Sequence, residues 1–306
     1  MRTNQGLDDC DNDMSQPDAT VSAIVVSYDS AAVLPACLRS LAAEQVTTIL
    51  VDNASTDGSV SVGESWGARI VRNQRNEGFG RAMNIGMRTA DTPFVLLVNP
   101  DLTLDPGAAT LLVDAARKYP DAAILAPRIV EPDGRIFFSN RSLLAPYLQN
   151  PTGVKWNPEG DCCTPFLLGA CWLVRRDLIL GIGGFDPQIF LFYEDDDLCR
   201  RVIQAGHSIV HVHGAVARHE RGASSAPAPG RIFKARFHLA WSRLYMQKKW
   251  GLSESSWRWA LLAAFKWIGA ALVFNRRRRE RYSGTVAGFL AHRRGQRALS
   301  REGLEP

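Results

Sequence analysis

Val21-Ser22-Ala23-Ile24-Val25-Val26-Ser27-Tyr28 is the stretch that decides the fold of this chain. A continuous apolar run of this kind is typical of a strand buried on both faces of a parallel sheet. The chain then alternates between helical and strand patterns. Helices are predicted at residues 31–44, 79–89 and 106–118, and strands at residues 48–51, 68–72 and 94–98. This alternation predicts an α/β fold with a mainly parallel central sheet flanked by helices.

The pattern becomes less regular after residue 118. Strands are predicted at residues 122–130, 135–138, 166–174 and 208–212, and helices at residues 195–205, 231–249 and 254–274. Residues 140–165 have no clear period and contain four prolines, so we expect a variable loop over the site. Three parts follow from these patterns: a disordered acidic tail at residues 1–19, a catalytic domain at 20–230, and a helical, basic extension at 231–306.

Charge is unevenly distributed along the chain. The net charge is +5, but residues 1–19 are acidic, and arginines gather at residues 276–281 and at Arg293, Arg294 and Arg297. A basic end indicates an anionic partner surface. Nucleic acid is disfavoured as that partner, because the core shows no basic patch interleaved with aromatic residues. The six cysteines lack C-x-x-C spacing, which indicates reduced cytosolic thiols, and the polar start of the chain predicts no signal peptide.

Polar side chains follow two predicted strands at the point where each strand ends. Asp52 and Asn53 follow the strand at residues 48–51, and Asp101 follows the strand at residues 94–98. In open α/β sheets, ligands bind at this edge. Each group could also be a helix cap or a turn residue, and the sequence leaves both interpretations open. As functional groups, Asp52 and Asn53 suit hydrogen bonds to a base or a ribose, and Asp101 suits a hard metal ion beside a diphosphate.

Four consecutive acids at residues 194–197 begin a predicted helix. The helix dipole and i,i+4 pairs with Arg200 and Arg201 account for two of them. The other two are unexplained by local structure, and aromatic residues directly precede the cluster. Apolar neighbours and like charges both raise the pKa of a carboxylate, which is how a general base is tuned. We therefore expect a general base in this cluster.

Two weaker signals complete the candidates. His219 follows a predicted strand and precedes a loop rich in glycine, serine and proline. Residues 76–80 read Asn-Glu-Gly-Phe-Gly and open a predicted helix, where an anion or a backbone segment could be bound. They are not a dinucleotide fingerprint, because Met83 occupies the third glycine position of G-x-G-x-x-G, and a Rossmann dehydrogenase is disfavoured.

Taken together, these motifs resemble glycosyltransferase family 2, the large inverting family with the GT-A fold. Within that family the chain is similar to rhamnosyltransferase-like enzymes of bacterial cell-wall and surface-polysaccharide assembly. The resemblance covers residues 21–225 and rests on the order and spacing of short motifs. These motifs lie at residues 25–28, 51–58, 76–84, 99–101, 169–176, 183–186 and 194–201.

The resemblance implies a donor site made of several matching positions. Tyr28, Asp52 and Asn53 would hold the nucleobase and ribose of a nucleotide-sugar donor. Gly78 and Asn84 would line the donor pocket.

The resemblance also implies a metal site and a catalytic base. Asp101 matches the last acid of the D-x-D motif, which ligates the metal, and His219 matches a late histidine that can also ligate it. Asn99 stands at the first position of that motif, where it contributes a neutral side chain to the donor site. Asp195 matches the catalytic base. The implied cofactor is Mg²⁺ or Mn²⁺.

The implied activity is an inverting hexosyl transfer to a hydroxyl of a cell-wall or surface-polysaccharide acceptor. Rhamnose from dTDP-rhamnose is the expected donor sugar, and the acceptor is a saccharide or a lipid-linked saccharide. Two alternatives remain: another UDP- or GDP-sugar as donor, or a nucleotidyltransferase. The second alternative lacks support, because Ser27-Tyr28-Asp29-Ser30 stands where a basic, glycine-rich phosphate loop should be.

Residues 257–274 form an apolar helical stretch that Arg258 and Lys266 interrupt. Because these two cations lie about 80° apart on a helix, they share one side. An amphipathic helix in the membrane interface, with the arginine cluster on anionic headgroups, fits this pattern better than a packed helix or a membrane span. We therefore expect a cytoplasmic protein, bound peripherally to the cytoplasmic face of the inner membrane, with no nucleic-acid partner.

Overall fold

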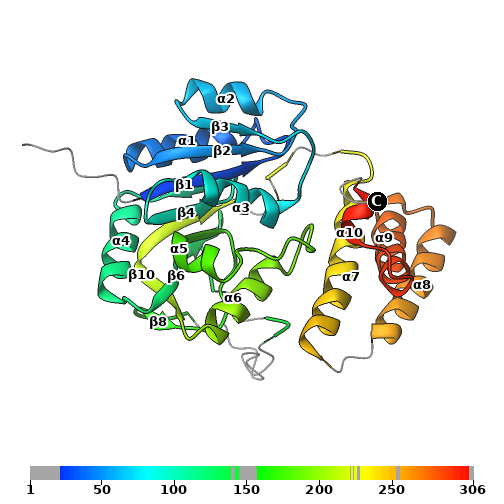
Figure 1. The fold of residues 1–306 in the computed structure, drawn as a ribbon. Helices are drawn as coiled ribbons and strands as arrows, with labels where there is room; N and C mark the ends of the chain where they lie inside the picture. The colour runs from blue at the N-terminus through cyan, green and yellow to red at the C-terminus, as the bar shows by residue number, and fades with distance from the viewer. Residues whose placement is uncertain are drawn as a thin grey trace, which may run out of the picture.

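The computed structural model describes residues 21–138, 142–144, 157–220, 222, 224–225, 228–252 and 256–302 (Figure 1). The predicted acidic tail at residues 1–19 lies outside the described residues, as does most of the loop predicted at 140–165. The described chain folds into an α/β domain followed by a group of helices, so the predicted fold class is confirmed.

The first half of the sheet is parallel. Its strands lie in the order β3-β2-β1-β4. They are β1 (Val21–Ser27), β2 (Thr47–Asp52), β3 (Arg69–Arg72) and β4 (Phe94–Val98). The register pairs Val25 with Leu50 on one side and with Val98 on the other. Because the strands run in one direction, their carboxyl ends meet at a single edge, which is where the predicted donor residues begin.

The second half of the sheet mixes directions and continues the order as β9-β6-β10-β5. Its strands are β5 (Leu102–Leu104), β6 (Ala122–Val130), β9 (Cys171–Arg175) and β10 (Ser208–His219), with short β7 (Ile136–Phe137) and β8 (Cys162–Cys163) at the side. Strand β9 runs antiparallel to both of its neighbours, β4 and β6. Strand β10 is parallel to β6 and antiparallel to β5.

Two strand boundaries differ from the prediction. Phe166 and Leu167 are buried, but they lie in a loop, and the strand predicted at 166–174 begins only at Cys171. Their apolar side chains pack into the core without pairing their backbone, and an apolar pattern reports burial rather than pairing. Strand β10 continues beyond the predicted residue 212 to His219, past an irregularity between Val212 and Val216.

Helices cover both faces of the sheet (Figure 1). Those on one face are α1 (Leu34–Ala43), α2 (Ser59–Ser65) and α4 (Ala108–Lys118), and those on the other are α3 (Phe79–Thr89), α5 (Arg176–Gly181) and α6 (Glu194–Gln204). Leu38 and Leu112 belong to the first core, and Met83 and Leu198 belong to the second. The start of α6 therefore faces the carboxyl edge of the sheet.

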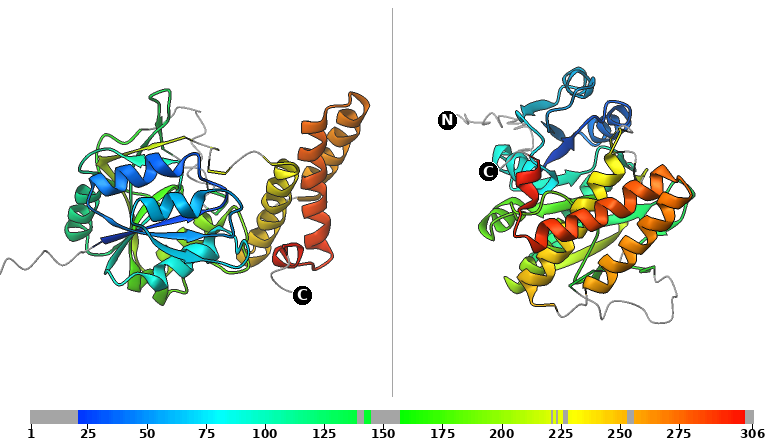
Figure 2. Two further views of the ribbon diagram at one scale, coloured as in Figure 1. Left: turned by 90° about the horizontal axis from the view of Figure 1, so that it is seen from above. Right: turned by 90° about the vertical axis from the view of Figure 1, so that its right-hand side faces the viewer.

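The C-terminal helices form a separate layer beside the α/β domain (Figure 2). They are α7 (Arg231–Trp250), α8 (Ser256–Leu272), α9 (Arg276–Arg293) and α10 (Ala298–Arg301). Helix α9 packs closely on α7, because a Cβ at Gly284 or Gly288 would stand 2.3 Å or 2.2 Å from a backbone oxygen of α7. Helix α8 packs against α9 and leaves much of its own surface exposed. Within the described chain, none of the helices combines the length and the apolar character that a membrane crossing requires.

Candidate active site

The carboxyl edge of the sheet and the start of α6 enclose a cavity of about 600 Å³. Six of the nine residues predicted to form the site line it: Tyr28, Asn53, Gly78, Asn99, Asp195 and His219. Segments that are far apart in the sequence therefore meet in one concave site, which is the usual form of a small-molecule site.

The end of β2 is fixed by hydrogen bonds from two loops. The Asn53 side chain donates to the Gly78 carbonyl over 3.1 Å and accepts from the Asn73 amide over 2.8 Å. Asp52 is buried and accepts from the Ser55 backbone N–H, whereas its second oxygen, Oδ1, is buried without a partner among the described residues. Tyr28 is 38% exposed and lines the cavity next to this loop. An exposed ring beside a fixed polar edge suits a planar base.

Gly78 is required by a close approach of two backbone segments. Its φ is +84°, and a Cβ there would lie 2.4 Å from the Phe190 carbonyl oxygen. The next residue, Phe79, donates its N–H to that same oxygen over 3.1 Å. Glycine is the residue that tolerates both the left-handed backbone and this contact. The start of α3 is therefore held against the segment that leads into α6.

Asp101 and His219 form a buried polar pair at one side of the cavity. His219 Nε2 lies 3.2 Å from Asp101 Oδ1, and the two residues are 6% and 4% exposed. Burial alone would raise the pKa of Asp101, but its hydrogen bonds and the nearby His219 lower that pKa overall. The side-chain oxygen of Asn99 is also buried without a partner in the described chain, and Asn99 lines the cavity.

This donor set fits a hard divalent cation. Mg²⁺ is bound in proteins through one or two carboxylates, with substrate phosphates and water completing its shell. The ionised Asp101 carboxylate would be one such ligand, and the His219 imidazole would be a second donor beside it. His219 Nδ1 is buried and has no partner among the described residues.

Asn84 does not occupy the predicted position. The cavity lining within the described chain does not include it, nor does it include Asp52 or Asp101. Its side-chain amide donates to the Phe185 carbonyl and accepts from the Phe185 N–H, both over 2.8 Å. Both ends of the amide are therefore used to join α3 to the turn before α6. We assign Asn84 a positioning role in place of the predicted donor contact.

The acidic start of α6 also lines the cavity, through Glu194, Asp195 and Asp196. Desolvation raises the pKa of Glu194 to about 8 and that of Asp196 to about 7, and the charge of Asp195 adds to both shifts. The pKa of Asp195 is also raised, because desolvation outweighs its hydrogen bonds from the backbone N–H groups of Gly169 and Asp196. These directions agree with the sequence-based expectation of a tuned acidic cluster. A carboxylate with a raised pKa accepts a proton more readily near neutral pH.

The backbone that enters α6 is strained. Phe192 and Tyr193 have φ values of +70° and +68°, in the left-handed region that bulky residues rarely adopt. Both residues line the cavity. Strain of this kind persists only where the surrounding structure fixes it, and it clusters at functional sites. It turns the chain sharply so that the first turn of α6 faces the cavity.

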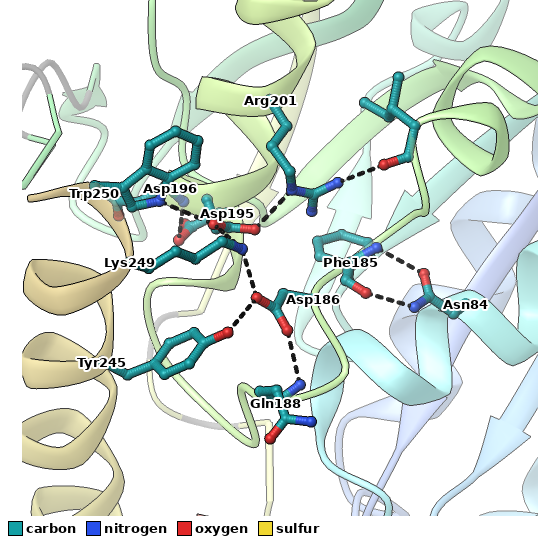
Figure 3. A network of polar contacts seen from close by, with 12 residues as sticks. Asn84, Phe185, Asp186, Gln188, Asp195, Asp196, Arg201, Tyr245, Lys249 and Trp250 are labelled. Carbon is teal, nitrogen blue, oxygen red and sulfur yellow. Dashed lines mark hydrogen bonds and ion pairs between the residues drawn. The ribbon is translucent and has the colours of Figure 1, made fainter. Parts of the chain in front are cut away.

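Helix α7 is tied to the same region by a buried ionic network (Figure 3). Lys249 Nζ lies 2.5 Å from Asp186 Oδ2 and 2.7 Å from Asp197 Oδ1. Asp197 is fully buried and is also held by Arg201 over 2.8 Å and by the Trp250 indole N–H over 3.0 Å. The predicted i,i+4 pair of Asp197 with Arg201 is thus confirmed. Tyr245, in contrast, donates its hydroxyl to Asp186 over 2.8 Å.

This network is not predictable from the local sequence, and neither is the hydrogen bond from the Gly169 N–H to Asp195. Lys249 and Asp186 are 63 residues apart, and the lysine lies in a predicted helix that gave no sign of its partner. The sequence does contain one signal for it. Residues 194–197 are four acids with only two arginines nearby, so at least one further cation is expected from another part of the chain.

Replacing Lys249 should destabilise the fold. Lys249→Met leaves the buried Asp186 and Asp197 carboxylates without their shared cation, so the free energy of unfolding should fall by about 2 kcal/mol at pH 7, discounted for the partial exposure of the lysine. The Lys249 cation helps to hold the pKa of Asp186 below its usual value, so the difference should shrink as pH falls through that lowered pKa. Urea unfolding at several pH values measures this difference in the free energy of unfolding between the variant and the wild type. Lys248→Met is the matched control, because Lys248 is exposed, and an equal loss in both variants would contradict the network.

Glu194→Gln should stabilise the protein as pH rises. The folded-state pKa of Glu194 is about 8, well above that of an unfolded chain. The stability that the protonated acid contributes is fully present below the pKa of the unfolded chain, and it is lost as pH rises through the pKa of the folded state. The melting temperature of the variant minus that of the wild type should therefore increase between pH 5 and 8 and should change little at higher pH. Glu64→Gln, an exposed acid, serves as control. A gap that does not change with pH would refute the raised pKa.

Comparison with known sequences identifies the family. The family described as glycosyl transferase family 2 matches residues 22–182. An N-acetylglucosaminyl-diphospho-decaprenol L-rhamnosyltransferase of Mycobacterium tuberculosis is 31% identical over 256 residues, which cover 71% of this chain and 83% of that protein. An uncharacterized glycosyltransferase of Mycobacterium bovis is 35% identical over 88 residues, which cover 29% of this chain and 39% of that protein.

Comparison with solved structures agrees on the fold. TarS of S. aureus, in a structure with UDP, superposes with a TM-score of 0.52 at 14% identity, over 90% of this chain and 92% of that one. The mannosyltransferase PcManGT of Pyrobaculum calidifontis, in complex with GDP-Man and Mn²⁺, superposes with a TM-score of 0.51 at 15% identity, over 89% and 86%. The fold is therefore the GT-A fold of glycosyltransferases. The chain belongs to glycosyltransferase family 2 and is a glycosyltransferase.

Proposed function

We propose that this enzyme transfers a sugar, with inversion, from a nucleotide-sugar donor to a hydroxyl of a lipid-linked saccharide. Rhamnose from dTDP-rhamnose is the proposed donor sugar. The observation that carries the reaction type is the cavity that His219, which contacts Asp101, lines together with the acidic start of α6. The similarity to the mycobacterial rhamnosyltransferase, whose name specifies a diphospho-decaprenol-linked sugar, supports the choice of donor and acceptor.

The proposed donor site lies along the ends of β1, β2 and β4. Tyr28 provides an exposed ring for the base, and Asn53 fixes the loop that surrounds it. Asp52 has an oxygen without a hydrogen-bond partner in the described chain, which suits a ribose hydroxyl. Asn99 offers a side-chain oxygen of the same kind on the cavity wall. The donor is therefore held by groups that are already fixed in place.

Asp195 is the proposed general base. Its raised pKa makes it a better proton acceptor than an exposed aspartate. Backbone N–H groups from Gly169 and Asp196 hold its two oxygens and orient the carboxylate. In the proposed step, Asp195 takes the proton of the acceptor hydroxyl while that oxygen attacks the anomeric carbon. The bond to the nucleoside diphosphate breaks on the opposite side, so a single displacement inverts the configuration.

Asp101 and His219 are the proposed ligands of a Mg²⁺ or Mn²⁺ ion. When bound, this ion would supply positive charge to the leaving diphosphate as a Lewis acid. Without a metal, the two side chains hold each other in position, with the Asp101 carboxylate kept ionised by its surroundings.

The proposed acceptor requires a site at a membrane surface. A polyprenyl-linked saccharide remains in the bilayer, so the enzyme has to meet it there. We therefore propose peripheral attachment to the cytoplasmic face of the inner membrane, as the arginine-rich C-terminal extension suggests.

Donor turnover tests the proposal. Purified protein with Mg²⁺ or Mn²⁺, a bacterial lipid extract and a panel of nucleotide sugars should release nucleoside diphosphate from dTDP-rhamnose. Asp195→Asn should reduce this release by at least about a hundredfold, since general-base catalysis contributes that much. Asp161→Asn serves as control, because this carboxylate is not among the residues that line the cavity and accepts a hydrogen bond from the Tyr119 hydroxyl. Release from a UDP- or GDP-sugar alone would contradict the rhamnose assignment, and unchanged turnover in Asp195→Asn would contradict the base.

Metal binding is tested without turnover. Mn²⁺ titrated into the protein in the presence of dTDP and followed by electron paramagnetic resonance should bind at least about tenfold more weakly to Asp101→Asn, because a charged ligand is lost. Asp105→Asn is the matched control, since Asp105 is paired with Arg218 near the surface. Equal affinity in the wild type and in Asp101→Asn would rule out Asp101 as a ligand.

A further inference from the structure

A second hollow, of about 430 Å³, lies between α7 and the start of α9. It shares no lining residue with the donor cavity. Four arginines dominate its wall: Arg236, Arg277, Arg278 and Arg281. We call these four residues the arginine pocket.

The positive charges of the arginine pocket are not balanced by carboxylates among the described residues. In the part of the chain that the structure describes, none of the four guanidinium groups forms an ion pair with a carboxylate, whereas the neighbouring Arg276 pairs with Glu280 over 3.2 Å. Partial burial lowers the pKa of Arg236, and the charge of Arg281 lowers it further. Like charges around a hollow repel one another unless an anion binds between them. Planar guanidinium groups are well suited to phosphate oxygens.

Exposed apolar side chains stand next to this pocket. Phe265 and Leu272 on α8 are each 74% exposed, and Phe274, in the turn into α9, is 86% exposed. Asn275, the next residue, already lines the arginine pocket. Further exposed apolar residues on α8 and in the turn after it are Trp257, Leu261, Leu262, Trp267, Ile268 and Val273. A patch of this size marks an interaction surface.

Charge decides which partner fits both features. Residues 256–279 contain no acidic side chain, whereas Arg258, Lys266 and four consecutive arginines are present. A second copy of the chain packed on this surface would bring these cations together. An anionic bilayer instead offers acyl chains to the apolar residues and phosphates to the arginines, at the depths where an interfacial helix needs them. Helices α8 and α9 form the outer layer on this side of the molecule, where such a surface can reach them (Figure 2).

We propose that the arginine pocket binds the phosphate of an anionic phospholipid while the exposed side chains of α8 lie among the upper acyl chains. The apolar and the phosphate contacts are continuous through the turn at residues 273–275. This binding site rests on the membrane attachment proposed above and gives it a specific lipid contact, and its occupancy needs neither donor nor acceptor. It can therefore be tested independently of glycosyl transfer.

Vesicle co-sedimentation tests the pocket with the full-length protein. Wild type should bind vesicles of phosphatidylcholine with phosphatidylglycerol and should bind pure phosphatidylcholine poorly. Arg277→Gln/Arg281→Gln should weaken binding to the anionic vesicles at least about tenfold, since each basic residue near the surface contributes to affinity. Arg293→Gln/Arg294→Gln removes the same charge from the other end of the same helix and should retain most of the binding. Circular dichroism and the melting temperature verify that each variant is folded.

Further measurements distinguish the lipid from soluble phosphate, from diffuse charge attraction and from a second copy of the chain. Phe265→Ser should also weaken vesicle binding, and lipids brominated on the upper acyl chain should quench tryptophan fluorescence in wild type only. If excess inorganic phosphate releases all of the bound protein from anionic vesicles, the pocket is a site for soluble phosphate, and the lipid assignment is overturned. Equal weakening in both double-arginine variants would overturn the pocket in favour of diffuse attraction. The surface would be assigned to a second copy of the chain if the wild type does not bind vesicles and forms a dimer in gel filtration that Phe265→Ser disrupts.

Discussion

Four consecutive carboxylates begin α6, and three of them, Glu194, Asp196 and Asp197, are at most 9% exposed. Removing so much negative charge from water is costly unless each group is protonated, hydrogen-bonded or paired. The structure uses a different solution for each. Glu194 has a pKa raised to about 8, Asp196 accepts hydrogen bonds from Ser142 and Leu143, and Asp197 is paired with cations. Asp195 remains half-buried at the cavity, where it can exchange a proton.

The need to neutralise Asp197 connects the catalytic domain to the C-terminal helices. Lys249 reaches from α7 to both Asp197 and Asp186, so the position of α7 is coupled to the first turn of α6. Helix α7 in turn carries α9 along its other side, through the close contacts at Gly284 and Gly288. The proposed lipid-binding surface on α8 and α9 would thus be joined to the proposed base by well-packed elements. Such a connection would fix the orientation of the cavity relative to the membrane.

Local signals in the sequence were sufficient for most elements. Residues 79–89 and 94–98 were predicted to the residue, because an amphipathic helix and an apolar run each bury their own side chains. The antiparallel insertion of β9 between β4 and β6 was not predictable, since pairing depends on partners far along the chain. The same limit applied to the site. Asn84 had the right residue type near the cavity, but its partner at Phe185 is 101 residues away and takes up its whole amide group.

Asp195 lines the cavity and Asp101 lies against His219 at its wall, and the pKa values of these two aspartates are shifted in opposite directions. At Asp101, hydrogen bonds and the nearby His219 overcome burial and lower the pKa, so this carboxylate stays ionised. At Asp195, desolvation exceeds two backbone hydrogen bonds and raises the pKa. A displacement that releases a diphosphate needs both properties in one site: constant negative charge to hold a cation, and a carboxylate that accepts a proton. When surroundings separate two carboxylates in this way, their roles can be assigned from the direction of each shift. The sign of the shift therefore supports Asp101 as the ligand and Asp195 as the base, and argues against the reverse assignment.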